Sequence, residues 1–256
     1  MRAKMQRVRN FQPRGPSGNF VDTQTRHALK QDKFVTATQS GLDWLESNRT
    51  GVLRWTITLV VVVGALIGGI YVWHQRSVAA DQLLSQAMDI YATPLATPGE
   101  PTPPGQKTYA TAADRAAAAY PLFEQAANKY NWLSAGKTAR YFAGVTAIDM
   151  GKTGQAEAEL KQAADADSSN IAALAKLALA NLYAQEGQTS PAAILFQALI
   201  AHPTTSVPKS AAQLQLAQMY ENSDINQAKQ IYAQIEDQDK GTDAAQIAQQ
   251  KLAKLK

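Results

Sequence analysis

The sequence predicts an all-α protein in which one N-terminal membrane-spanning helix precedes an α-solenoid of helix pairs. Two observations predict this fold class. Residues 55–73 form an uninterrupted apolar run, and the chain from residue 110 onward is rich in the helix formers Ala, Gln, Leu and Lys with no strand alternation. In that second region a set of residue offsets recurs every 36 or 37 residues. A period of this length is typical of stacked helix pairs.

The apolar run extends from Trp55 to Trp73 and contains no charged residue. A helix of this length measures roughly 28 Å, close to the hydrocarbon thickness of a bilayer. A helix is the expected form because hydrocarbon offers the backbone no hydrogen-bond partners. Trp55, Tyr71 and Trp73 lie at its ends, where aromatic rings prefer the headgroup level. We place the transmembrane helix at residues 52–74.

Two other interpretations of this run are less favoured. A buried helix of a soluble domain is usually shorter and keeps a polar edge. A cleaved signal peptide has a short basic leader and an apolar core of about 7–15 residues. Here 54 residues precede the run, and the small residues Ala79 and Ala80 follow Arg76 rather than the apolar core.

Charge predicts the orientation of the span. Residues 1–54 hold ten Lys or Arg against four acidic residues, whereas residues 74–256 hold fifteen basic and seventeen acidic residues. Between Trp73 and Lys107 the only Lys or Arg is Arg76. Basic flanks remain on the cytoplasmic side, so we expect a cytoplasmic N-terminus and an extracytoplasmic C-terminal domain.

The N-terminal part contains two segments. Residues 1–21 combine basic residues with Pro and Gly and are predicted to be a disordered basic cytoplasmic tail. Such a tail could attract anionic lipid or RNA, but orientation and solubility alone would explain it. Residues 22–48 are predicted to be an amphipathic cytoplasmic helix. It would lie on the membrane surface or pack on a partner, or it would only lead into the span.

Within the span, Gly64, Gly68 and Gly69 form a narrow face of small residues. Two backbones can approach closely at such a face, so it is a candidate surface for helix pairing and for a homo-oligomer. Glycine is also common in membrane helices without such a role.

We assign no catalytic, cofactor-binding or metal-binding residue. The chain has no cysteine, and His27, His74 and His202 have no carboxylate at ligand spacing. Hydrolase, zinc-protease and phosphate-loop motifs are absent from the sequence. The large C-terminal part is slightly acidic, which argues against nucleic-acid binding. We therefore expect a protein that is not an enzyme.

After the span, residues 77–256 are predicted to form one extracytoplasmic domain. It begins with a helix over residues 77–91 that we expect to continue the membrane helix, or nearly so, and to end before Pro94. Residues 93–105 contain five prolines and two glycines and are predicted to be an exposed loop. A proline-rich partner motif is the alternative, but its signal is weak.

The repeat is a set of shared internal offsets. One copy is Gly144, Gly151, Ala156, Leu160 and Ala163, and the next is Ala180, Gly187, Ala192, Phe196 and Leu199, both with offsets of 7, 5, 4 and 3. A third copy, one residue shorter in its turn, is Leu216, Ala217, Tyr220, Ala228, Tyr232 and Ile235, and a half copy is Ala119, Phe123 and Ala126. A small residue would let two helices cross closely, glycine would reverse the chain, and the later residues would fill the groove between them.

This arrangement resembles the tetratricopeptide repeat. The resemblance is carried by LALANLYAQEGQTSPAAILFQALIAHP at 177–203 and covers residues 110–235. Tyr183, Gly187, Ala192, Phe196 and Pro203 fall at or within one residue of the positions that the repeat requires. The chain departs from the pattern in lacking Trp in the first helices, in its longer period, and in the loop that divides the first pair.

The whole chain resembles the YfgM-like family, ancillary subunits of the bacterial SecYEG translocon, although its basic tail is longer than is usual there. The resemblance implies a single-pass protein of the bacterial inner membrane with its repeat domain in the periplasm. It implies a protein–protein interaction scaffold for protein export and envelope protein folding, whose partners are translocon subunits, periplasmic chaperones or nascent polypeptide. The alternative is an oligomeric structural or assembly protein of the envelope with no export role.

Overall fold

The computed structural model describes residues 44, 47–97, 99, 105 and 107–255, and these contain nine helices and no strand. The predicted all-α class is confirmed for this part of the chain. The predicted tail over 1–21 lies outside the described residues, as does the helix over 22–48 except for residues 44, 47 and 48. The chain divides into two compact units, Met1–Gly68 and Gly69–Lys256.

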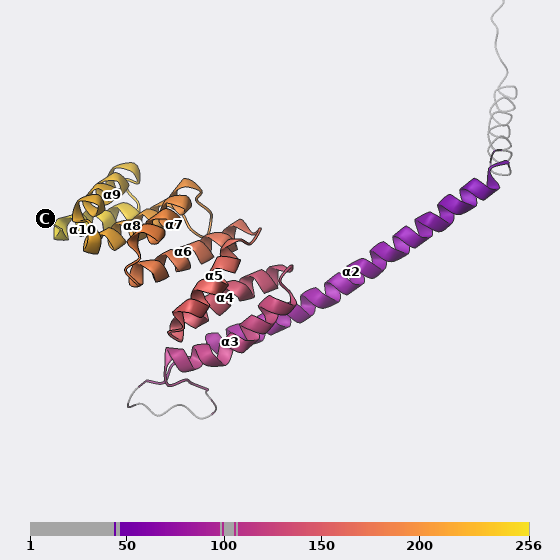
Figure 1. Cartoon of the computed structure of the whole chain (residues 1–256), viewed down its shortest axis with the longest axis horizontal. Coiled ribbons are helices and arrows are strands. Elements are labelled where there is room, and N and C mark those ends of the chain that lie inside the picture. The colour runs from indigo at the N-terminus through magenta and orange to yellow at the C-terminus, as the bar shows by residue number, and fades with distance from the viewer. Residues whose placement is uncertain (1–43, 45–46, 98, 100–104, 106, 256) are drawn as a thin grey trace, which may run out of the picture. The chain divides into compact units, whose positions relative to one another are not determined.

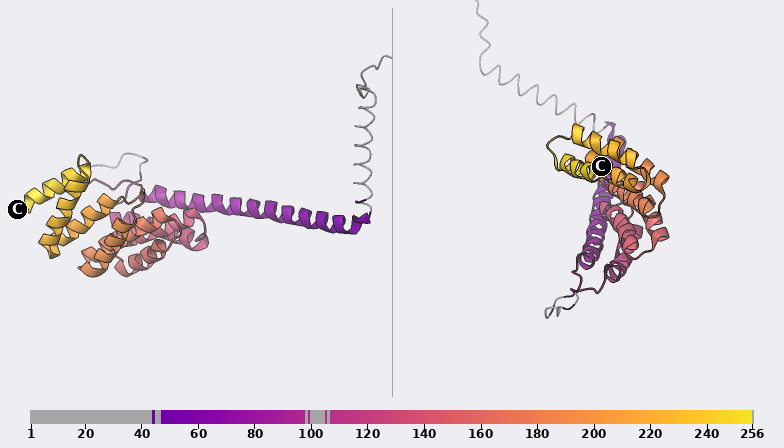
Figure 2. Two further views of the ribbon diagram at one scale, coloured as in Figure 1. Left: turned by 90° about the horizontal axis from the view of Figure 1, so that it is seen from above. Right: turned by 90° about the vertical axis from the view of Figure 1, so that its left-hand side faces the viewer.

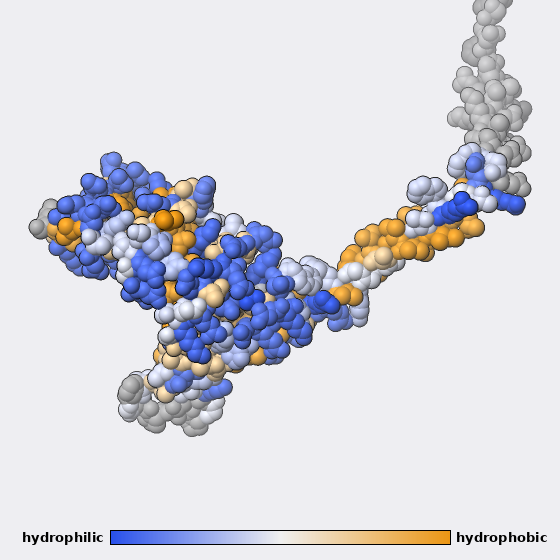
Figure 3. Space-filling view, in the orientation of Figure 1, coloured by the Kyte–Doolittle hydropathy of each residue, from blue (hydrophilic) through white to orange (hydrophobic). Residues whose placement is uncertain are grey.

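Helix α2 (Arg49–Tyr91) contains the whole apolar run and is the one helix of the described residues that is long and apolar enough to cross a membrane. Its most apolar window is 0% buried, so it is not the core helix of a folded domain. Figure 3 shows this surface as a continuous apolar band. The hydroxyls of Thr56 and Thr58 donate to the carbonyls of Val52 and Arg54, at 2.8 and 2.9 Å. These bonds satisfy two polar groups within the helix.

The segment predicted to be helical over 77–91 is the last part of α2, continuous with the apolar run as predicted. No proline interrupts the chain between the apolar run and Tyr91, so the helix continues. The described part of the predicted 93–105 loop lies outside any helix. Its base is closed by two main-chain bonds, from the N–H of Ala96 to the carbonyl of Tyr109 at 2.8 Å and from the N–H of Tyr109 to the carbonyl of Pro94 at 3.2 Å.

Eight further helices complete the second unit, and each packs on the next along the chain (Figures 1 and 2). They are α3 (Ala112–Lys129), α4 (Ser134–Asp149), α5 (Thr153–Ala164), α6 (Ser169–Gln185), α7 (Thr189–Ala201), α8 (Lys209–Ser223), α9 (Ile225–Gln238) and α10 (Asp243–Lys254). Helices α4, α6 and α8 also contact one another in succession. The three pairs α4/α5, α6/α7 and α8/α9 therefore stack through their first helices.

The residues of the predicted offsets lie at equivalent places in these pairs. Tyr220 is half-buried, and the other apolar members are buried in the core: Ala156, Leu160, Ala163, Ala180, Tyr183, Ala192, Phe196, Leu199, Leu216, Ala217, Ala228, Tyr232 and Ile235. Gly144 is buried in α4, and a Cβ atom there would lie 2.6 Å from Cγ and Cδ2 of Leu160 in α5. The glycine thus allows the close crossing of α4 and α5 that the offsets predicted.

Glycine also makes the two turns for which it was predicted. Gly151 and Gly187 have φ values of +71° and +75°, a left-handed conformation that favours glycine. The following N–H groups bond back into the preceding helix, from Lys152 to the carbonyl of Ala147 at 2.9 Å and from Gln188 to that of Tyr183 at 2.8 Å.

The third turn is shorter because it uses an aspartate. Asp224 both ends α8 and begins α9, and its Oδ1 accepts from the N–H groups of Asn226 and Gln227, each at 3.1 Å. A side-chain cap of this kind satisfies the free N–H groups at the start of a helix. It replaces the glycine of the other two turns and accounts for the missing residue.

An aromatic cluster joins the end of α2 to α3 and α4. The ring centroid of Tyr91 lies 6.2 Å from the ring centroid of Phe123 and 6.2 Å from that of Phe142. The rings of Phe123 and Phe142 stack with their centroids 5.4 Å apart. The Tyr91 hydroxyl donates to Oδ2 of Asp149 at 2.9 Å. Burial and this bond raise the pKa of Tyr91 to about 12, so the tyrosine is neutral at physiological pH.

A partly buried ion pair ties α3, α4 and α5 together. Nη1 of Arg140 lies 2.9 Å from Oε2 of Glu159, and both side chains are almost covered. Nη2 donates to the carbonyl of Ala127 at 3.2 Å and to Oδ1 of Asn128 at 2.8 Å. Covered charges of this kind need several such partners to offset the cost of losing water.

Gly144→Ala should destabilise the domain by about 1–3 kcal/mol, because the added methyl group meets Leu160 where the two helices cross. Gly154→Ala is the matched control, since nothing lies within 4 Å of a Cβ atom there. It should leave the free energy of unfolding unchanged or raise it by up to about 1 kcal/mol. Urea unfolding of residues 77–256 followed by circular dichroism measures both. Equal midpoints for the two variants would contradict the close crossing.

Candidate functional site

A polar groove of about 750 Å³ lies between α6 and α8. We call it the amide groove. Its lining residues are Asn181, Ala184, Gln185, Gly187, Thr189, Phe196, Gln215, Gln218, Met219, Asn222 and Ser223. No charged side chain is among them, so the groove offers hydrogen bonds without a preference for ligand charge.

Side-chain amides dominate this lining. They belong to Asn181, Gln185, Gln215, Gln218 and Asn222. None of the five forms a side-chain hydrogen bond with another described residue. Each amide has both a donor and an acceptor, as a peptide group does. All but Asn181 are exposed to solvent, so a polypeptide main chain would take the place of the water that these amides bind.

The repeat places these amides in register. Asn181 follows Ala180 and Gln218 follows Ala217, so both occupy the same position of their helix pair. Gln185 and Asn222 share a second position, five residues after the same two alanines. In α4 these positions are Val145 and Asp149, and Asp149 is bonded to Tyr91. The amide pattern is therefore a property of α6 and α8 and not of α4.

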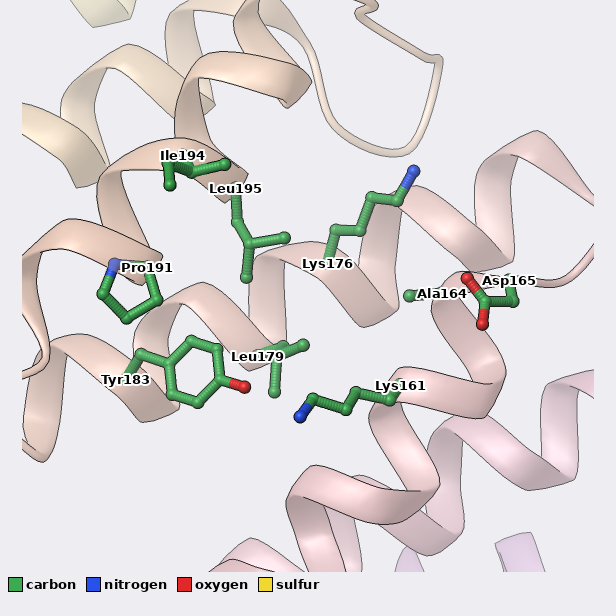
Figure 4. Close-up of a pocket in the computed structure, with 9 residues that line it drawn as sticks. All are labelled: Lys161, Ala164, Asp165, Lys176, Leu179, Tyr183, Pro191, Ile194 and Leu195. Carbon is green, nitrogen blue, oxygen red and sulfur yellow. The ribbon is translucent and has the colours of Figure 1, made fainter.

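A second groove, of about 400 Å³, lies between α5, α6 and α7 (Figure 4). We call it the apolar groove. It is lined by Lys161, Ala164, Asp165, Lys176, Leu179, Tyr183, Pro191, Ile194 and Leu195. Figure 4 shows apolar side chains of α6 and α7 facing the space, with lysines at its edge. Ile194 is 66% exposed, which leaves a large apolar side chain free at the rim.

One edge of the apolar groove is held by a small polar network. The Tyr183 hydroxyl donates to Oε1 of Glu157 at 2.7 Å, and Nζ of Lys161 lies 2.6 Å from the same oxygen. The hydrogen bonds from Lys161 and Tyr183 lower the pKa of Glu157 below its usual value. Burial and the bond to Glu157 raise the pKa of Tyr183. The tyrosine is thereby fixed with its ring against the groove.

The residues predicted from the repeat take two roles. Most form the core and turns, but Tyr183 lines the apolar groove, and Gly187 and Phe196 line the amide groove. Tyr220 is half-buried in α8, and the Tyr232 hydroxyl donates to Oε1 of Glu221.

The amides of the amide groove were missed by the sequence analysis. Their recurrence one and five residues after Ala180 and Ala217 was the available signal.

The glycines of the predicted pairing face lie in α2. No other described side chain or distant main chain lies within 4 Å of a Cβ position at Gly64, Gly68 or Gly69, so the face is open. Helix pairing through it stays a prediction.

In the part of the chain that the structure describes, no three His, Cys, Asp or Glu residues are grouped as a metal site would require.

No family model matches the chain, and neither a curated protein nor a solved structure matches it. The resemblances to the tetratricopeptide repeat and to the YfgM-like family therefore enter only as proposals.

Proposed function

We propose that this protein is a membrane-anchored scaffold whose tetratricopeptide-like solenoid holds a polypeptide in the amide groove. The observation that carries the proposal is the row of amides in α6 and α8, four of which lie at equivalent repeat positions. An extended polypeptide exposes main-chain N–H and C=O groups that need partners when they leave water. Side-chain amides supply both kinds of partner.

The chemistry of the groove favours recognition of a main chain over recognition of charge. Each hydrogen bond adds only about 0.5–1.5 kcal/mol, so several are needed for a stable complex. Five amides provide that number within one groove of about 750 Å³. Binding of this kind tolerates many side-chain sequences, which suits a scaffold that meets unfolded or emerging polypeptides.

The apolar groove would be a separate site for a side chain, because Leu179 and Tyr183 lie on the face of α6 opposite Asn181 and Gln185. Its volume of about 400 Å³ is within the range of ligand pockets, and Leu179, Leu195 and Ile194 supply apolar surface. Burial of one large apolar side chain contributes roughly 1.5–3 kcal/mol. The apolar groove would therefore take a second segment or another partner, and not the segment held by the amides.

In this proposal α2 crosses the bacterial inner membrane once, with the N-terminus in the cytoplasm and the domain in the periplasm. The charge difference between the flanks of the apolar run supports this orientation. The partners would then be translocon subunits, periplasmic chaperones or nascent polypeptide, as the resemblance to the YfgM-like family implies. No nucleic acid, cofactor or catalytic step is proposed.

The alternative is an oligomeric structural or assembly protein of the envelope. The open glycine face of α2 favours it, because a second copy could pack closely against Gly64 and Gly68. In that case α2, and not the grooves, would determine the partner.

A photo-reactive amino acid at Gln218 should crosslink to other proteins in intact cells, identified by mass spectrometry of the adducts. The same residue at Gln249 is the matched control, because Gln249 is an exposed glutamine of α10 outside the amide groove. Adding Asn181→Ala and Asn222→Ala should reduce the Gln218 adducts by removing two groove amides. Identical adducts at both positions would refute binding in the groove, and adducts with copies of this chain alone would favour the oligomer.

A second prediction concerns topology. Alkaline phosphatase fused after Lys256 should be active, because the proposed orientation carries the C-terminus to the periplasm, where the enzyme folds. A cytoplasmic reporter fused at the same residue should be silent. The reverse pattern of activities would show that the domain lies in the cytoplasm.

A further inference from the structure

The outer face of α7 carries no charge. Helix α7 contains no Asp, Glu, Lys or Arg, although five of its residues are exposed: Ser190, Ile194, Gln197, Ala198 and Ala201. The second helices of the neighbouring pairs differ, since α5 exposes Lys161 and α9 exposes Asp237. Charged residues are depleted at the centres of protein interfaces. The exposed face of α7 therefore has the composition of an interface centre.

This face places an apolar side chain beside the apolar groove. Ile194 is 66% exposed and is the most exposed large apolar residue of the described chain outside α2. Pro191, Leu195 and Leu179 line the groove next to it (Figure 4). A protruding side chain and a groove on one face make that face self-complementary, because in a twofold dimer each copy can insert its side chain into the groove of the other.

The charges at the rim of the groove are self-complementary too. Lys161 is already paired within the chain, since its Nζ lies 2.6 Å from Oε1 of Glu157. Lys176 and Asp165 line the same groove, and neither side chain forms an ion pair or hydrogen bond within the part of the chain that the structure describes. Figure 4 shows both of them on the side of the groove away from Pro191. A twofold axis passing between them would set each lysine against the aspartate of the other copy.

We propose that α7 and the apolar groove form a homodimer interface, in which Ile194 of each copy enters the groove of the other and Lys176 of each copy pairs with Asp165 of the other. A twofold dimer requires both members of each contact on one face, as here, whereas a different protein requires only one. The interface is separate from the glycine face of α2. It does not rest on polypeptide binding, because the amide groove uses the other face of α6.

Energy transfer between copies of the full chain in detergent micelles tests this proposal. The sequence has no cysteine, so one cysteine added after Lys256 carries either the donor or the acceptor dye. Ile194→Glu should weaken dimerisation by at least about tenfold, because it sets a carboxylate against apolar surface twice in each dimer. Ile247→Glu is the matched control, since Ile247 is a 44% exposed isoleucine of α10 outside both grooves, and it should leave dimerisation unchanged.

Charge reversal tests the second contact. Lys176→Glu and Asp165→Lys should each weaken the dimer, because each sets like charges against one another across the axis. The chain with both substitutions should dimerise as the wild type does, because the ion pair returns with its signs exchanged. Circular dichroism of every variant verifies that the helices remain folded.

Four results would overturn the interface. They are absence of energy transfer in the wild type, transfer that Ile194→Glu leaves unchanged, an equal loss with Ile247→Glu, and a double charge variant that stays as weak as the single ones. Transfer that is lost with Gly64→Leu and Gly68→Leu but kept with Ile194→Glu would place the dimer contact in α2 instead. None of these results bears on the amide groove, which the Gln218 adducts test separately.

Discussion

In each helix pair a small residue lies where the two helices cross, and the second helix fills the crossing with a large side chain. Gly144 meets Leu160 directly, and Ala180 with Phe196 and Ala217 with Tyr232 occupy the same positions in the next two pairs. All four of these later residues are almost completely buried. Because the two helices of each pair pack so closely, the first helices α4, α6 and α8 can contact one another in succession. The amide groove lies between two of these first helices, so it depends on the same crossings.

The features that sequence predicted are those set by local spacing: the long apolar helix, the glycine turns and the buried positions of each pair. What it missed depends on residues far apart in the chain. Tyr91 bonds to Asp149, 58 residues away, and Arg140 of α4 pairs with Glu159 of α5, 19 residues away, and neither contact has a periodic signature. Asp224 replaces a turn glycine through a side-chain cap, which a search for glycine cannot find. The site amides were missed because polar surface residues carry no core signal.

The proposed scaffold function draws on the two grooves and on the apolar helix. The amide groove can satisfy a main chain, and the apolar groove can hold a large side chain. The amide groove requires no particular charge on the ligand, since it has no charged lining residue, whereas Lys161, Asp165 and Lys176 line the apolar groove. A scaffold that meets unfolded polypeptides at a membrane needs this tolerance. Translocon subunits and periplasmic chaperones, as proposed partners, would bring such polypeptides to it.

The central claim, that α6 and α8 hold a polypeptide main chain, is tested most directly by hydrogen–deuterium exchange of the full chain in lipid nanodiscs. Exchange is compared with and without a saturating unfolded polypeptide. The account predicts slower exchange in the last turns of α6 and α8, around Asn181 and Gln218, and no change in α10. Unchanged exchange in α6 and α8, or protection confined to α9 and α10, would contradict it.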